Sequence, residues 1–221
     1  MPRSSIKTKP IIPQPEHQSL CQQVWGLDWS REFPIDLGDG VRIEYKTFHE
    51  AQPLMKTLLP EVYQLVPGTS RFGEADPHHF KEKYFSALGD FFAFYEGETN
   101  IGMAIGTLLD WSSYNFRNIA VAPAYQNQGL YPQFFEVLSR ILKAHGVARI
   151  EGDVAPTNRH HIHALNKMGY IVTSMTYGER WGVLLHITKY LDEADEERLG
   201  QLYSTTYKTD AAANKKFKGK G

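Results

Sequence analysis

The chain has 221 residues, of which 42% are hydrophobic and 22% charged, an ordinary globular composition that suffices for one domain with a sizeable core. Its net charge of −1 argues against a nucleic-acid-binding or membrane-surface protein, because both favour a basic field. The single cysteine, Cys21, excludes an internal disulfide framework and fits a reducing compartment. No apolar run approaches the ~20 residues of a membrane span, and no secretory signal follows the basic N-terminal residues, so we expect a cytoplasmic protein without a membrane partner.

Residues 1–39 are predicted to form an N-terminal extension in two parts. Residues 1–19 contain four prolines and little periodicity, which is typical of a flexible arm. Residues 20–39 carry large apolar side chains between polar ones: Trp25, Leu27, Trp29, Phe33 and Ile35. Because such side chains are seldom left in solvent together, we expect this part to pack on the domain, although a partner contact is the alternative.

Residues 40–191 are predicted to form a mixed α/β domain. Strands are expected where apolar and polar residues alternate, or where aromatic and β-branched residues gather: residues 41–46, 91–95, 100–109, 117–122, 148–154, 169–175 and 181–191. Helices are expected at residues 48–59 (ended by Pro60), at 76–88, from Pro132 to about His145, and from Thr157 or Asn158 to Lys167. The segment 91–109 predicts an antiparallel hairpin, whereas the strand–helix–strand unit 117–154 predicts a parallel pair.

The C-terminal residues 192–221 are predicted to lie outside this domain. Residues 192–204 favour a charged surface helix, and the end of the chain is a small, basic and flexible tail. A solvated tail is the simplest interpretation, and a weak contact with an acidic partner or nucleic acid is the alternative.

The stretch that points to a function begins with the apolar run 119–121. Pro123 ends this strand because it has no N–H for the ladder, and a polar turn follows that closes with Gly129. An amphipathic helix comes next, and Pro132 suits its first turn; Gly146 is its expected C′ residue. A strand, a glycine turn and a helix N-terminus together present unpaired backbone N–H groups and a positive helix dipole, which suit a phosphate group.

The residues from Val121 to Tyr131 resemble the pyrophosphate loop of the GNAT superfamily of acyl-CoA N-acyltransferases. That loop has Arg or Gln, any two residues, Gly, any residue, and then Gly or Ala. Gln126 and Gly129 match this pattern, whereas Tyr131 departs from it. The resemblance therefore implies an acyl-CoA, such as acetyl-CoA, as the acyl donor.

A second match to the same superfamily lies downstream. Asn158 and the pair Gly169–Tyr170 have the family spacing at the two ends of a short helix. The resemblance covers about residues 40–191. It implies a GNAT-like α/β fold with a mixed central sheet flanked by helices, whose parallel strands splay apart after the loop-bearing strand and hold the pantetheine arm in the gap.

The cofactor-binding residues that the resemblance implies lie on the loop-bearing strand, on the loop and at the start of the short helix. They are Ile119, Val121, Gln126, Asn127, Gln128, Gly129, Leu130, Tyr131 and Asn158. The Val121 N–H would bond the thioester carbonyl and stabilise the developing oxyanion. Asn158 has an alternative role as a plain helix cap.

The catalytic groups differ from those of many GNAT enzymes. The Tyr that often acts as general acid, seven residues after the Asn, is replaced by Leu165. Asp153 stands five residues before Asn158, where related enzymes place a carboxylate base, and it is a candidate base or a structural strand-end residue. His163 is a second acid–base candidate, or a solvated helix residue. The histidines of this helix lack the spacing of a zinc site, so we expect no metal.

The sequence thus predicts an N-acetyltransferase that transfers an acetyl group from acetyl-CoA to a small-molecule or protein amine in a ternary complex. A non-catalytic acyl-CoA-binding sensor or scaffold is the alternative, motivated by Leu165 and Tyr131. A homodimer is left open. An acceptor pocket suited to a cationic amine is expected from aromatic and acidic side chains: Tyr63, Phe72, Phe80, Tyr84, Trp111, Tyr114, Glu74 and Asp110.

Overall fold

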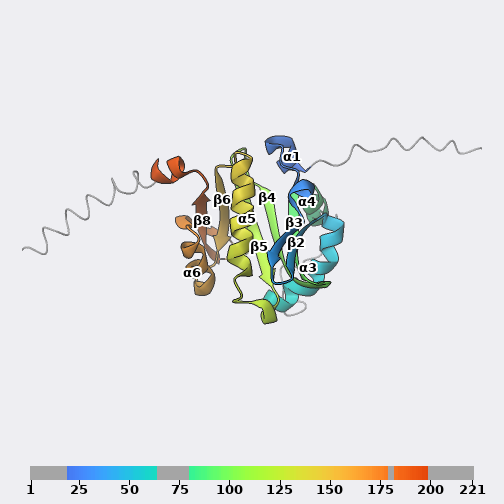
Figure 1. Ribbon diagram of the computed structural model, residues 1–221. Coiled ribbons are helices and arrows are strands. Elements are labelled where there is room, and N and C mark those ends of the chain that lie inside the picture. Colours follow the sequence, from blue (N-terminus) through green and yellow to red (C-terminus); the bar gives the residue numbers. More distant parts are fainter. Residues whose placement is uncertain (1–18, 64–79, 179–181, 199–221) are drawn as a thin grey trace, which may run out of the picture.

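The computed structural model of the chain describes residues 19–63, 80–178 and 182–198. Over these residues, eight strands form one sheet in the order β1-β2-β3-β4-β5-β6-β8-β7 (Figure 1). The strands are β1 Ile35–Gly38, β2 Val41–Lys46, β3 Gly89–Glu96, β4 Thr99–Leu108, β5 Ser113–Val121, β6 Arg149–Val154, β7 Ile171–Gly178 and β8 Gly182–Tyr190. The helices are α1 Leu20–Trp25, α2 Trp29–Glu32, α3 Phe48–Tyr63, α4 Phe80–Leu88, α5 Leu130–Ala144 and α6 Arg159–Lys167, with a 3₁₀ turn, η2, at Pro123–Tyr125. Residues 193–198, within the predicted surface helix 192–204, are also helical.

The sheet is mixed, as the sequence predicts. β3 and β4 form the expected antiparallel hairpin, and β5 pairs with β6 in parallel through the crossover helix α5. The other neighbouring strands of the described sheet are antiparallel. The predicted α/β fold class is therefore confirmed.

Helices cover the sheet on both faces (Figure 1). Alternation along β3 sends Phe92 toward α5, where its ring lies 5.4 Å from that of Phe134, and sends Phe91 toward α3, where its ring lies 5.8 Å from that of Phe48. The first face carries the larger apolar cluster and the second face the smaller one. No helix in the described ranges combines the length and the apolar character that crossing a membrane requires.

The N-terminal segment contributes to the larger cluster. Leu27, Trp29 and Phe33 are buried there, and the Trp29 ring meets Phe92 edge-on at 5.1 Å. β1 extends the sheet by pairing with β2.

Residues 1–18 of the predicted arm and residues 199–221 of the predicted tail lie outside the described residues, as do 76–79 of the predicted helix 76–88.

Two predicted element bounds differ from the structure by four residues. The first helix was expected to end at Pro60, but α3 continues to Tyr63. Proline removes one helical hydrogen bond while its ring keeps a helical φ, so a last turn can still follow it. The strand expected at 117–122 begins at Ser113, because Tyr114 and Phe116 alternate into the core before the short apolar run is reached.

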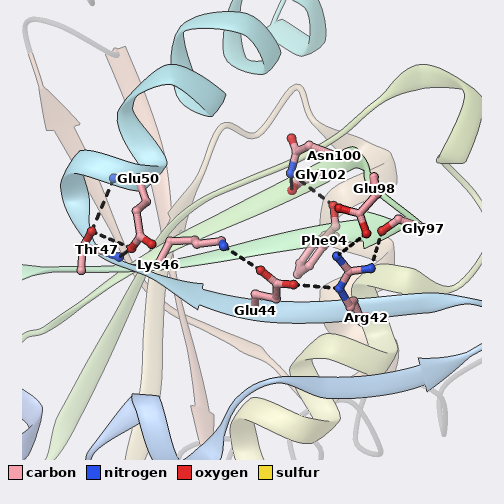
Figure 2. Close-up of polar contacts among 10 residues, drawn as sticks. All are labelled: Arg42, Glu44, Lys46, Thr47, Glu50, Phe94, Gly97, Glu98, Asn100 and Gly102. Carbon is pink, nitrogen blue, oxygen red and sulfur yellow. Dashed lines mark hydrogen bonds and ion pairs between the residues drawn. The ribbon is translucent and has the colours of Figure 1, made fainter.

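The start of α3 follows from a capping box beside the charged surface of β2 (Figure 2). Thr47 Oγ1 accepts a hydrogen bond from Glu50 N over 3.4 Å, and the Glu50 carboxylate accepts one from Thr47 N over 2.8 Å. On β2, Glu44 binds both Arg42 and Lys46, at 2.7 and 2.6 Å. These contacts define the helix start and give one face of β2 a row of half-buried, paired charges.

A carboxyl group lies inside the larger cluster, away from the loop at Gly129. Asp90 of β3 is buried, and the Cys21 thiol of α1 donates to its Oδ2 over 3.3 Å. Burial raises the pKa of Asp90 to about 7. Burial, together with Asp90, also raises the pKa of Cys21 above its ordinary range.

We expect the wild-type protein to lose stability as pH rises, because Asp90 ionises, and the variant Asp90→Asn to lack this loss. The pKa of Asp90 is about 7 in the folded chain, against an ordinary value of 3.8, so the folded state binds more protons between these pH values. The free energy of unfolding therefore falls as pH rises through that window and is lowest above it. The free energy of unfolding of Asp90→Asn minus that of the wild type should therefore be up to about 4 kcal/mol larger at pH 8 than at pH 4.

Urea denaturation of both proteins between pH 4 and pH 8 measures this difference. The change of this difference with pH tests the prediction, whereas its absolute size does not. The asparagine amide also adds a hydrogen-bond donor, whose effect on stability does not depend on pH. A difference between the two proteins that stays constant over the range would contradict the raised pKa of Asp90.

Candidate functional site

The site begins where β5 and β6 separate. The two strands pair only from Ser113 with Arg149 to Asn115 with Glu151, after which β5 continues to Val121 and β6 to Val154. We call this point the fork. The resemblance to the GNAT superfamily implies such a splay, and the observed pairing agrees with it.

Two local features help to open the fork. Between Gly106↔Phe116 and Ile105↔Asn118 the register of β5 shifts by one residue, so Arg117 is the extra residue of a β-bulge. On β6, a Cβ at Gly152 would lie 2.9 Å from the Phe116 carbonyl oxygen. The bulge bends β5, and the glycine lets the two backbones touch just before they diverge.

The end of β5 turns its backbone toward the fork. Ala122 N donates to Ile101 O of β4 over 2.8 Å, and Val121 pairs with Gly102. Because backbone groups alternate in direction along an antiparallel ladder, the N–H and C=O of Val121 and Ile119 point away from β4. These groups therefore face the side from which β6 has departed.

The loop after β5 is held in shape by two glutamine side chains. Gln126 Nε2 donates to Val121 O and Gln128 Nε2 donates to Ala124 O, each over 2.9 Å. Asn127 between them adopts a left-handed conformation with φ 63°. These predicted cofactor residues thus determine the loop conformation through their side chains.

Gly129 caps α5 in a way that suits an anion. It has φ 81° and makes no side-chain cap, so the first N–H groups of α5 are not closed off by a capping side chain. A Cβ at this position would meet only Gln133 Nε2, at 3.5 Å. Leu130, the first helical residue, is buried and anchors the helix start in the core. This open helix start, which we call the cradle, suits an anion such as a phosphate group.

Tyr131, which departs from the family pattern, extends toward α6. Its hydroxyl lies 2.7 Å from His161 Nε2, and its ring packs against Phe135 at 4.7 Å. Burial lowers the pKa of His161, which favours the neutral imidazole. The tyrosine therefore joins the first turn of α5 to α6.

The start of α6 is capped by Asn158, whose Oδ1 accepts from His161 N over 3.2 Å. This shows the capping role that the sequence left as one alternative, and pantetheine binding stays a prediction. Leu165 is buried in the larger cluster, whereas His160 and His163 are exposed. Among the described residues no group of histidine, cysteine and carboxylate side chains has the arrangement of a metal site.

Asp153 lies next to a histidine that the sequence reasoning did not name. Asp153 is opposite His186 of β8, and its Oδ1 is 3.0 Å from His186 Nδ1. The other ring nitrogen, Nε2, is 3.1 Å from Glu151 Oε2. Strand alternation predicts that Asp153 and Glu151 share a face, but the β6–β8 register that adds His186 comes from pairing across 33 residues.

The row of charges continues beyond Glu151. Arg149 binds Glu151 through Nε, and its terminal nitrogen lies 3.1 Å from Asp110 Oδ2. On this face of β6, Asp153 and Glu151 supply two carboxylates and Arg149 one guanidinium, and Asp110, from the connection between β4 and β5, adds a carboxylate beside Arg149. Arg149 and Asp110 lie at the paired end of β6, so the surface toward the open end of the fork carries the carboxylates of Glu151 and Asp153 and is acidic.

The expected acceptor pocket is corrected in part. Tyr114 is fully buried on the α5 face and lines no pocket. Trp111 is 81% exposed but precedes Ser113, so it lies at the end of β5 remote from Gly129. Phe80 and Tyr84 of α4 are exposed. The side chain of Tyr63 and the residues Phe72 and Glu74 lie outside the described part of the chain.

Comparison with known proteins agrees with this architecture. Residues 59–170 match the sequence model of the Acetyltransferase (GNAT) family. No curated protein sequence matches the chain.

Three solved structures illustrate the likeness in fold. The ribosomal-protein-S5-alanine acetyltransferase from Vibrio fischeri is 13% identical, with TM-score 0.55 over 73% of this chain and 98% of its own. The ribosomal-protein-S18-alanine N-acetyltransferase from Escherichia coli is 19% identical, with TM-score 0.52 over 69% and 94%. A GNAT family acetyltransferase from Elizabethkingia anophelis with acetyl-CoA bound is 17% identical, with TM-score 0.51 over 69% and 99%. The family match spans half of the chain and the fold agrees with it, so this chain belongs to the GNAT family of acetyltransferases.

Proposed function

We propose that the chain is an N-acetyltransferase that moves an acetyl group from acetyl-CoA to an amine in a ternary complex. The observation that carries this proposal is the fork of β5 and β6 followed directly by the glycine cradle at the start of α5. One feature offers backbone groups to an extended arm, and the other offers N–H groups to phosphates. The family match supports acyl transfer in general.

In this proposal the phosphates bind at the first turn of α5. Gly129 leaves room for them, and the N–H groups that follow it donate, with Gln126, Asn127 and Gln128 supplying the loop backbone. Tyr131 borders the cradle on the α6 side, where its bond to His161 holds the ring.

The acyl arm lies along β5. The Val121 N–H, which faces the fork, donates to the thioester carbonyl oxygen and stabilises the charge that develops there. Ile119 offers its backbone to the pantetheine amides, and Asn158 does so from the start of α6. Positioning of this kind supplies much of the rate of acyl transfer.

Asp153 receives the proton that the acceptor amine must lose. It stands near the end of β6, and its side chain is 46% exposed, so an amine can reach it. Leu165 is buried and cannot donate, and therefore the thiolate takes a proton from the attacking amine or from water. His163 remains the second candidate for an acid–base role.

The acceptor is a cationic amine in this proposal. The carboxylates of Asp153 and Glu151 beside the fork attract an ammonium group, and the exposed rings of Phe80 and Tyr84 suit an apolar neighbour. Both small amines and protein N-termini meet this description. We place the reaction in the cytoplasm, since Cys21 is a free thiol, and a homodimer remains compatible with it.

A non-catalytic acyl-CoA sensor or scaffold is the second candidate function. It is favoured by one observation, the burial of Leu165 at the position where many GNAT enzymes present a tyrosine. Such a protein would bind acetyl-CoA and release no thiol.

Binding and turnover together test both functions. Acetyl-CoA at 100 times its dissociation constant should raise the free energy of unfolding by about 2.7 kcal/mol, which a thermal scan detects. Incubation with a panel of small amines and peptides with free N-termini should then release CoA thiol. Stabilisation without release would support the sensor, and no stabilisation by millimolar acetyl-CoA or CoA would exclude both.

A further inference from the structure

We propose that His186 is the proton acceptor behind Asp153, and that Asp153, His186 and Glu151 act as one relay for the amine proton. The proposal rests on the acetyltransferase function above and names a residue that neither the family motifs nor the sequence pattern points to. His186 acts through Asp153, and Glu151 is a positioning residue for the ring.

The geometry places a carboxylate oxygen at each nitrogen of one imidazole ring. Asp153 Oδ1 lies 3.0 Å from Nδ1, and Glu151 Oε2 lies 3.1 Å from Nε2. A neutral imidazole has one N–H and can donate to only one of these carboxylates, whereas the cation donates to both. When the ring gains a proton, His186 therefore donates a hydrogen bond to Asp153 and another to Glu151 at the same time.

Glu151 determines which nitrogen is left for Asp153. Arg149 donates to Oε1 of Glu151 through Nε and is itself bound to Asp110, which fixes the Glu151 side chain with Oε2 toward the ring. A carboxylate oxygen fixed at Nε2 accepts the N–H of the tautomer with the proton on Nε2. Nδ1 is then the nitrogen that can receive a proton from Asp153.

Exposure increases along the relay toward the acceptor side. The side chains of Glu151, His186 and Asp153 are 11%, 26% and 46% exposed, respectively. A substrate amine can therefore meet Asp153 while the ring stays behind it. On the β7 side of His186 the described hydrogen bonds are neutral: Thr173 Oγ1 donates to His186 O and bonds the Thr188 hydroxyl.

Both protons that the acceptor loses are accounted for without another reactant. The acceptor ammonium gives one proton to Asp153, which passes it to Nδ1 of His186 and returns to the carboxylate form. The neutral amine then forms the N–C bond as the C–S bond breaks. Its second proton leaves with the thiolate as CoA thiol, and the proton on His186 is lost to solvent before the next turnover.

His186→Asn tests the relay, because the amide occupies the space near Nδ1 but accepts no proton. We expect kcat/KM to fall by about tenfold or more, and its acidic limb to move to lower pH, because the final proton acceptor is then a carboxylate instead of an imidazole. The dissociation constant of acetyl-CoA should not change. Thr188→Val is the matched control on β8: it removes a buried hydroxyl on the same strand and should keep both the rate and the pH profile.

The double variant Asp153→Asn/His186→Asn separates a shared path from two independent contributions. If both residues act in one proton path, the kcat of the double variant should match that of Asp153→Asn within about twofold, because Asp153→Asn alone already blocks the path. A loss equal to the product of the two single losses would overturn the proposal, as would an unchanged pH profile in His186→Asn.

A measurement without turnover distinguishes this proposal from the function on which it rests. The imidazole nitrogen NMR signals of His186 should show the Nε2–H tautomer and should shift in Asp153→Asn. His186 signals that do not change in Asp153→Asn would overturn the relay even in an active enzyme. Absence of thiol release by the wild type with every amine would overturn the proposed function, and the relay with it, while leaving the NMR contact intact.

Discussion

Replacing Asp153 by asparagine is expected to lower kcat by about 10²-fold or more while leaving the dissociation constant of acetyl-CoA nearly unchanged. Asparagine keeps the shape of the side chain but cannot take the proton of the acceptor amine. The side chain lies on β6 beyond the fork and bonds the His186 ring, so its loss removes the first step of proton removal. Steady-state kinetics beside acetyl-CoA titration measure the two quantities.

Asp36→Asn provides the control for the change of charge. Asp36 lies on β1 at the other edge of the sheet, where its Oδ1 accepts from Gly38 N over 2.7 Å, and asparagine can keep that bond. This variant should retain wild-type turnover. Full activity in Asp153→Asn would remove the residue from the mechanism and make His163 the next candidate to test.

Gly129→Glu should weaken acetyl-CoA binding at least about 100-fold, equivalent to 2.7 kcal/mol, in a protein that still folds. The side chain would enter the open cradle at the start of α5, and its charge would repel the pyrophosphate. At φ 81° any residue other than glycine also costs about 1–2 kcal/mol of stability. Isothermal titration with acetyl-CoA measures the binding, and thermal unfolding measures the cost.

Gly146→Glu separates the effect on binding from the effect on the backbone. Gly146 follows the other end of α5 with φ 79°, and a Cβ there would meet nothing within 4 Å. The same substitution therefore imposes the same left-handed strain far from the cradle. It should lose similar stability and keep acetyl-CoA affinity; equal affinity in the two variants would mean that the phosphates bind elsewhere.

The sequence by itself predicts the parts of this protein whose signals are local. The run from Val121 to Gly129 determines a strand, a turn and a helix N-terminus, because proline and glycine restrict the backbone within a few residues. Asn158 forms the predicted cap and Gly146 the predicted left-handed C′ residue for the same reason. The mixed sheet follows from the order of these elements, and the fork is implied by the resemblance to the GNAT superfamily.

The tertiary structure decided what depends on strand register and on side chains that meet across the fold. Tyr114 was predicted in an acceptor pocket and is core, because the early start of β5 sets which of its residues face α5. Tyr131 extends to His161 on another helix. His186 meets Asp153 only through the β6–β8 pairing, and a shift of one residue would turn its ring to the opposite face. Side chains of this kind are positioned by hydrogen bonds between distant strands, which no local pattern of residues specifies.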